Sequence, residues 1–148
     1  MINAAIDIGS NSILLYIEKD GEKLYDDGKI TKLGSELQNT GKLSEISIKN
    51  SIEVLKKFIN ICKEFKTDNI YAVGTMALRV AFNSGEFADK VKNETGIKIN
   101  IIPAEEEARL SYLGASDVLQ KGDLPKTVID IGGGSTEFIN GVGEKILN

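Results

Sequence analysis

The chain carries one loop pattern twice, and this repetition limits how it can fold. Residues 7–12 read Asp-Ile-Gly-Ser-Asn-Ser, and residues 130–135 read Asp-Ile-Gly-Gly-Gly-Ser. Each copy follows a short apolar run, at residues 4–6 or 127–129, and is followed by further strand-like sequence. Both copies therefore predict tight turns of β-hairpins.

The composition of both turns suits phosphate binding. Glycine and small hydroxyl or amide residues let the backbone curl around an anion with its N–H groups pointing inward. An aspartate beside such a turn can hold a divalent cation that neutralises phosphate oxygens. Aspartate and glycine are also ordinary hairpin residues, and a single copy favours that simpler interpretation. The repetition in the same order favours a site in which two turns grip a phosphate chain.

The composition limits the partners of such a site. The chain has 148 residues, 41 % of them hydrophobic, which suffices for one well-packed domain and not for two complete ones. With 18 basic and 22 acidic residues the net charge is -4, and no basic cluster indicates a nucleic-acid surface. Because an acidic protein that binds polyanions needs local positive charge, the sequence predicts a requirement for Mg²⁺.

Histidine is absent and cysteine occurs once. The lack of histidine excludes Ser-His-Asp and Cys-His nucleophile systems and histidine metal sites. The single Cys62 excludes a disulfide within the chain, and its place in an apolar helical pattern indicates a buried thiol. No segment resembles a signal peptide or is long enough in apolar residues to span a membrane, so we expect a cytoplasmic protein with no membrane partner.

Strands dominate the first part of the chain, and helices alternate with strands in the rest. Alternating patterns predict an antiparallel meander over 4–8, 13–19 and 23–30. After a polar loop over 32–43, a helix over 44–65 begins with a serine that can cap it. The remaining segments are predicted as strands over 70–73 and 97–102 and helices over 76–81, 86–94 and 104–119. The order β-β-β-α-β-α-β-α, followed by a hairpin, predicts an α/β fold with a mixed sheet covered by helices.

Four motifs in a fixed order resemble one known family. They are residues 5–12, residues 74–83 (Gly-Thr-Met-Ala-Leu-Arg-Val-Ala-Phe-Asn), residues 106–110 (Glu-Glu-Ala-Arg-Leu) and residues 130–137 (Asp-Ile-Gly-Gly-Gly-Ser-Thr-Glu). Together they resemble the exopolyphosphatase and guanosine pentaphosphate phosphohydrolase (Ppx/GppA) family along the whole chain. The resemblance implies a ribonuclease-H-like domain of the actin-like ATPase kind.

The activity implied by this resemblance is Mg²⁺-dependent phosphoanhydride hydrolysis. Polyphosphate would lose a terminal phosphate, or guanosine pentaphosphate its 5′-terminal phosphate, and the two substrates stay equal alternatives. By resemblance, Glu107 is the general base for the attacking water. Without the resemblance, Glu105, Glu106 and Glu107 read as a solvated acidic first helical turn, with Glu105 paired to Arg109. Glu105 and Glu106 keep that interpretation.

The resemblance also assigns the other site residues. Asp7 and Asp130 would hold Mg²⁺, and Glu137 would help to position metal or water. Arg79 matches the family's phosphate-binding arginine, although the charge alone fits a solvated helix surface equally well. The expected donors to phosphate oxygens are Ser10, Asn11, Ser12, Gly132, Gly133, Gly134 and Ser135.

The chain is shorter than the resemblance implies. Family members continue into a second ribonuclease-H-like domain, so we expect residues 1–122 to form the first domain. Residues 123–148 would be a linker and the first hairpin of a truncated second domain, and the chain alone would be weakly active or inactive. Gly122 and Pro125 indicate a linker over 121–126, so the hairpin is expected over 127–147. Because a lone hairpin is marginal in water, we expect it to pack on its own domain or to pair with another copy, giving a homodimer.

Two other functions remain open from the sequence. The first is an ATP-dependent kinase of the same superfamily, which residues 106–108 and the Ser-Asn-Ser turn disfavour. The second is a non-catalytic phosphate-binding or oligomerising module, in which two short chains meet as two domains would. The absence of a Gly-x4-Gly-Lys-Ser/Thr motif excludes a Walker-type NTPase.

Overall fold

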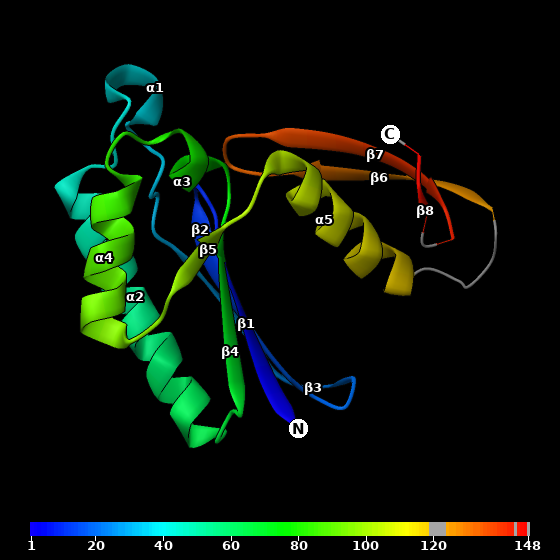
Figure 1. Ribbon diagram of the computed structural model, residues 1–148, viewed down its shortest axis with the longest axis horizontal. Coiled ribbons are helices and arrows are strands. Elements are labelled where there is room, and N and C mark those ends of the chain that lie inside the picture. The colour runs from blue at the N-terminus through cyan, green and yellow to red at the C-terminus, as the bar shows by residue number, and fades with distance from the viewer. Residues whose placement is uncertain (119–123, 144, 148) are drawn as a thin grey trace.

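A computed structural model describes residues 1–118, 124–143 and 145–147. Its larger sheet contains β1 (Ile2–Ile8), β2 (Ser12–Lys19), β3 (Glu22–Ile30), β4 (Asn69–Gly74) and β5 (Ile99–Ile101). The strand order is β3-β2-β1-β4-β5, and the sheet lies at the centre of Figure 1. β1 pairs antiparallel with β2 and parallel with β4, so the predicted mixed sheet is confirmed.

Helices cover one face of this sheet. α2 (Glu45–Glu64) begins after Ser44, whose Oγ accepts the backbone N–H of Ser47 at 3.2 Å, as the capping prediction requires. α4 (Ser84–Thr95) packs against α2 and ends at Gly96, which has a left-handed φ of 78°. Figure 1 shows both helices on one side of the sheet and α5 (Ala104–Val118) on the other.

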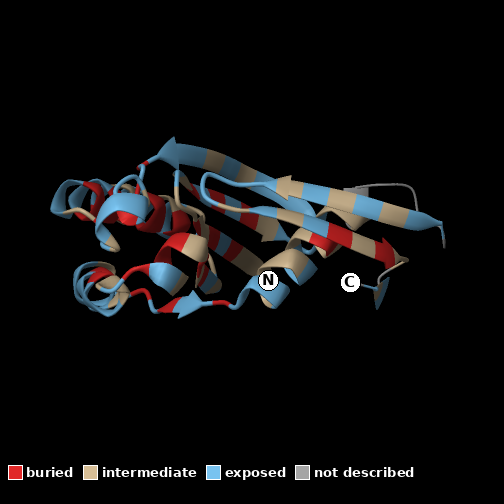
Figure 2. Ribbon diagram, turned by 90° about the horizontal axis from the view of Figure 1, so that it is seen from above, coloured by how far each residue is buried: buried red, intermediate tan, exposed pale blue. Residues whose placement is uncertain are grey.

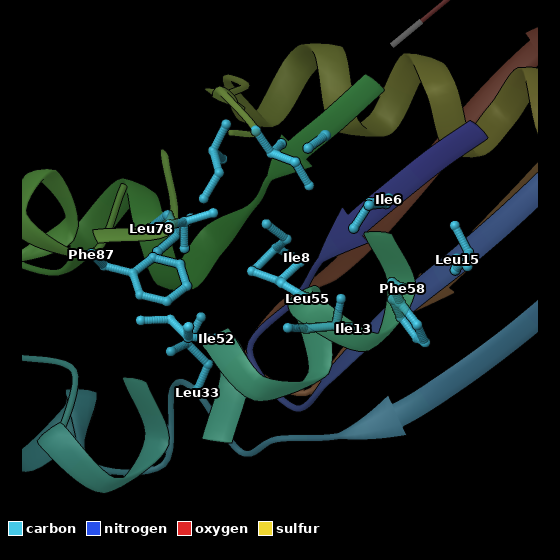
Figure 3. Packing of buried hydrophobic residues seen from close by; sticks show 14 of the residues in the cluster. Ile6, Ile8, Ile13, Leu15, Leu33, Ile52, Leu55, Phe58, Leu78 and Phe87 are labelled. Atoms are coloured by element: carbon cyan, nitrogen blue, oxygen red, sulfur yellow. The ribbon is translucent and has the colours of Figure 1, made fainter. Parts of the chain in front are cut away.

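Alternate residues of the first two strands build the core. Ile6 and Ile8 of β1 and Ile13 of β2 are fully buried in one cluster with Leu55 of α2 (Figure 3). Each such side chain contributes about 1.5 to 3 kcal/mol through burial. Asp7 lies between two of these positions, so the strand pleat points its side chain to the sheet face opposite α2.

A smaller sheet forms the other side of the molecule. Its strands, in the order β6-β7-β8, are β6 (Pro125–Ile131), β7 (Thr136–Val142) and β8 (Lys145–Ile146). α5 packs on its inner face, where Ile139 and Tyr112 are fully buried and the Tyr112 hydroxyl donates to the Gly143 carbonyl at 3.0 Å. The hairpin therefore packs on its own chain. The outer face exposes Ile129, Ile131 and Phe138, and Figure 2 shows the alternation along the strands.

Two predicted segments differ from the structure. The loop expected over residues 32–43 contains a short helix, α1 (Leu37–Thr40), which forms because Leu37 is buried and Gly41 ends the turn with a φ of 68°. The strand expected over 97–102 is limited to β5. The helical turn expected over 76–81 is present as α3 (Met76–Val80).

The predicted linker over 121–126 is partly outside the described residues, as is the boundary near Gly122. Pro125 and Lys126 belong to β6, where they pair with β7, so the hairpin begins earlier than predicted. The division into residues 1–122 and 123–148 stays a prediction. Cys62 is buried, as its apolar neighbours indicate. Within the described ranges, no helix is both long and apolar enough to cross a bilayer.

Candidate active site

The two repeated turns have the same local structure. In the first, the Gly9 N–H donates to the carbonyl of Ser12 at 3.0 Å. In the second, the Gly132 N–H donates to the carbonyl of Ser135 at 2.9 Å. Each turn joins two antiparallel strands, β1 to β2 and β6 to β7. The sequence repeat is therefore a structural repeat, as the hairpin prediction requires.

The turns contact each other directly. A Cβ atom added to Gly133 would lie 2.6 Å from Asn11 Cβ and 3.2 Å from the Asn11 backbone nitrogen. A Cβ on Gly134 would lie 1.9 Å from Met76 Cε and 3.1 Å from Ser10 Oγ. Glycine is therefore needed here for close approach. The need is stricter at Gly133, because the Asn11 Cβ is fixed to the backbone, whereas the Met76 Cε beside Gly134 is the end of a flexible side chain.

A hollow of about 200 Å³ lies where the turns meet. Its acidic lining consists of Asp7 from the end of β1, Glu107 from the first turn of α5 and Asp130 from β6. The phosphate donors predicted from the two turns also line it, namely Ser10, Asn11, Ser12, Gly132, Gly133, Gly134 and Ser135. Arg79, the other predicted phosphate-binding residue, is not among the lining residues. The fold thus brings the predicted base, two predicted metal ligands and both turns to one place.

Asp7 is the carboxylate most affected by this arrangement. Burial, followed by the nearby charges of Glu107 and Asp130, raises the pKa of Asp7 to about 6. Its Oδ1 atom is buried and has no hydrogen-bond partner among the described residues. A buried carboxylate oxygen beside two other carboxylates is stabilised by a cation.

The cation that these groups fit is a small, hard one. Within the described part of the chain, no three Asp, Glu, Cys or His side chains lie close enough together to hold a metal by themselves. Mg²⁺ commonly binds one or two carboxylates and takes its other ligands from water and substrate phosphates. Asp7 and Asp130 match that pattern.

Glu107 and Arg79 form a partly buried ion pair. Arg79 Nη1 lies 2.5 Å from Glu107 Oε2 and also donates to the carbonyl of Ile102 at 3.1 Å. The two side chains are only 20 % and 15 % exposed, so Arg79 is not the solvated surface residue that its charge alone allows. The pair fixes Glu107 at the edge of the hollow.

Asp130 is held from α5 and from its own sheet. Ser111 Oγ donates to Asp130 Oδ2 at 2.5 Å. Glu137 lies directly opposite Asp130 in the β6–β7 ladder, on the same face of the hairpin. Unlike the other predicted ligands, Glu137 is not among the residues that line the hollow.

The sequence reasoning missed several residues of this region, among them Thr75, Met76 and Ser111. Thr75 and Met76 line the hollow directly after β4, which runs parallel to β1 and ends beside it. Ligands commonly bind at the carboxyl ends of parallel strands, so the position of Thr75 and Met76 next to Asp7 could have indicated a role in the site. Ser111 gave no sequence signal, since its role depends on how α5 packs on the hairpin.

One predicted ion pair is wrong. Arg109 pairs with Glu106 and not with Glu105, with two N–H···O contacts of 2.8 Å each. The forked guanidinium reaches both oxygens of the residue three positions earlier, one turn back on the same helix face. This pair lowers the pKa of Glu106. Glu107 is paired with Arg79 and not with Arg109.

Comparison with solved structures first defines the class of fold. MreB5 of Spiroplasma citri matches with a TM-score of 0.53 at 16 % identity, covering 99 % of this chain and 50 % of that one. This likeness shows the actin-like fold alone. The match to the model of the Ppx/GppA phosphatase family, over residues 17–148, is more specific. The chain belongs to the Ppx/GppA phosphatase family.

Individual relatives agree with this membership. The Aquifex aeolicus family member matches with a TM-score of 0.86 at 41 % identity, covering 100 % of this chain and 49 % of that one. An exopolyphosphatase from Cytophaga hutchinsonii matches with a TM-score of 0.94 at 30 % identity, covering 99 % and 48 %.

A curated relative is also similar in sequence. The guanosine-5′-triphosphate,3′-diphosphate pyrophosphatase of Photobacterium profundum is 35 % identical over 144 residues, which are 95 % of this chain and 29 % of that protein. The chain thus spans less than a third of this relative and about half of the solved ones.

Proposed function

We propose that the protein hydrolyses a terminal phosphoanhydride bond of polyphosphate or guanosine pentaphosphate, with Mg²⁺. The observation that carries the proposal is the meeting of Asp7, Glu107, Asp130 and both turns around one hollow. Family membership and the relatives, one an exopolyphosphatase and one a guanosine pentaphosphate pyrophosphatase, support the substrate class.

The two turns would hold the phosphate groups. Backbone N–H groups at Gly133 and Gly134, with the hydroxyls of Ser10, Ser12 and Ser135, line the hollow and can donate to phosphate oxygens. Because these donors are fixed before the substrate arrives, they need no reorganisation as charge develops. Because the turns contact each other, these donors would lie on two sides of one anion.

Asp7 and Asp130 would hold the magnesium ion. The raised pKa of Asp7 and its unpartnered buried oxygen fit a carboxylate that a cation completes. When bound, Mg²⁺ neutralises phosphate charge and so favours approach of the nucleophile. Without a cation, three carboxylates in the hollow repel a polyanion.

Glu107 would act on the attacking water. Its Oε2 atom is bound by Arg79, so Oε1 is the oxygen that would accept the water proton. The water oxygen forms a bond to the terminal phosphorus, the phosphoanhydride P–O bond breaks, and the shortened chain leaves as an anion. Arg79 keeps the carboxylate in position through its ion pair with Glu107.

The test compares two glutamates of the same helical turn. Glu107→Gln should lower Mg²⁺-dependent phosphate release from polyphosphate by about 10² to 10⁴, the usual contribution of a general base. Glu105→Gln removes the same charge at an exposed position and should release phosphate like the unaltered chain. Equal Mg²⁺-dependent release by the Glu107→Gln variant and by the unaltered chain would contradict the proposal.

A further inference from the structure

A second hollow, of about 490 Å³, lies beside the first. The two share Ser10, Asn11, Met76, Gly133 and Gly134, which line both. The residues where the two turns meet therefore border both hollows. An extended ligand held at the turns in the first hollow has the second as its neighbour.

The two hollows differ in charge. The charged residues lining the first are Asp7, Glu107 and Asp130, all acidic. Of the described residues that line the second, Lys32 is the only charged one. An anion that extends beyond the turns therefore gains attraction in the second hollow and avoids the carboxylates of the first.

The backbone of Lys32 is hydrogen-bonded to the first turn. Its N–H donates to the Asn11 carbonyl at 2.9 Å, and the Gly34 N–H donates to the Ser10 carbonyl at 2.8 Å. Its φ of 53° lies in the left-handed region, which a lysine rarely adopts. The surrounding hydrogen bonds maintain this conformation, so the lysine keeps a fixed place beside the phosphate-binding turn.

We propose that the second hollow binds phosphate groups remote from the bond that breaks, with Lys32 as their cation. The inference rests on the proposed function, since it assumes that the first hollow holds the scissile phosphate. The remote phosphates could belong to a polyphosphate chain or to the 3′-diphosphate of guanosine pentaphosphate. Both present the same chemistry to an ammonium group.

The experiment measures binding and not turnover. In a Glu107→Gln background with Mg²⁺, calorimetry compares pyrophosphate with long-chain polyphosphate, and GTP with guanosine pentaphosphate. Lys32→Gln should weaken the longer ligand of at least one pair by about tenfold and the shorter one by less than about twofold. The pair that responds identifies the source of the remote phosphates.

Two matched variants complete the test. Lys32→Arg keeps the charge and should bind within about threefold of the parent, which separates a charge effect from a disturbed turn. Lys42→Gln removes the same charge at an exposed position that lines neither hollow and should bind like the parent. Equal loss for short and long ligands, or equal loss with Lys42→Gln, would overturn the inference.

The catalytic proposal and this inference fail in different ways. If Glu107→Gln hydrolyses polyphosphate as fast as the unaltered chain, the assignment of the base fails while the length-dependent effect of Lys32 can still be measured. If Lys32→Gln binds long and short ligands like its parent, the second hollow has no role and the catalytic proposal stands.

Discussion

The Asp7 carboxylate illustrates the conflict between stability and function at a single residue. It is buried, it has two acidic neighbours, and one of its oxygens has no partner among the described residues. Without a cation, ionisation of Asp7 therefore opposes folding. Sites that bind charged ligands commonly carry such a cost.

This cost predicts a pH-dependent effect of Asp7→Asn. The pKa of Asp7 rises from 3.8 to about 6 on folding, so its favourable contribution is present below pH 3.8 and is lost as pH rises through about 6. Without Mg²⁺, the variant should be more stable than the unaltered chain by at most about 3 kcal/mol near pH 8. The two should be equally stable near pH 4.

Urea unfolding at several pH values measures this difference. The Asp26→Asn variant serves as the control, because Asp26 is an exposed aspartate of β3 that does not line the hollow. A constant difference between Asp7→Asn and the unaltered chain across the range would show that Asp7 ionises freely, and the electrostatic account of the site would be wrong.

At the scale of elements, α5 connects the proposed base with the second turn. Glu107 and Ser111 are four residues apart and therefore lie on one helix face, one turn apart. Glu107 lines the hollow together with Asp7, while the Ser111 hydroxyl donates to Asp130. Tyr112 attaches the same helix to the far end of the hairpin through Gly143. α5 thus orients the hairpin relative to the first turn.

Removing the Ser111 hydroxyl should loosen this connection. Ser111→Ala should lower the free energy of unfolding by about 1 to 2 kcal/mol, because the lost hydrogen bond goes to a half-buried carboxylate beside Glu137. Ser116→Ala is the matched control, since Ser116 Oγ on the same helix is buried with no described partner. Its removal should be neutral or slightly stabilising. Urea unfolding of both variants measures this difference. An equal change in the free energy of unfolding for the two variants would contradict the role of Ser111.

The elements that the sequence predicts well are those with strong local signals. The meander and α2 have clear periodicity, turn residues and a serine cap, and all are found near their expected positions. α1 was missed because four residues carry too little periodicity, and it depends on burial of Leu37 against the rest of the fold. The Glu106–Arg109 pair was missed because spacings of three and four residues compete on a helix.

For the whole molecule, the sequence predicts the fold class and most of the polar residues that line the hollow, but not how these residues are brought together. The repeated turns and the four motifs are sufficient for these predictions. The contact of Gly133 with Asn11 and the pairing of Arg79 with Glu107 depend on how α5 and the hairpin pack on the first sheet, which no local pattern specifies. The domain division near residue 122 and the homodimer remain predictions.

The most direct test of the central claim uses the sign of a charge effect. If Asp7 and Asp130 hold a cation for the phosphates, Asp7→Asn and Asp130→Asn should each weaken tripolyphosphate binding when Mg²⁺ is present. Without Mg²⁺, each should strengthen binding, because it removes a negative charge that repels the ligand. Calorimetric titrations under both conditions measure this inversion. The same direction of change with and without Mg²⁺ would contradict the claim that the two turns form one magnesium-dependent phosphate site.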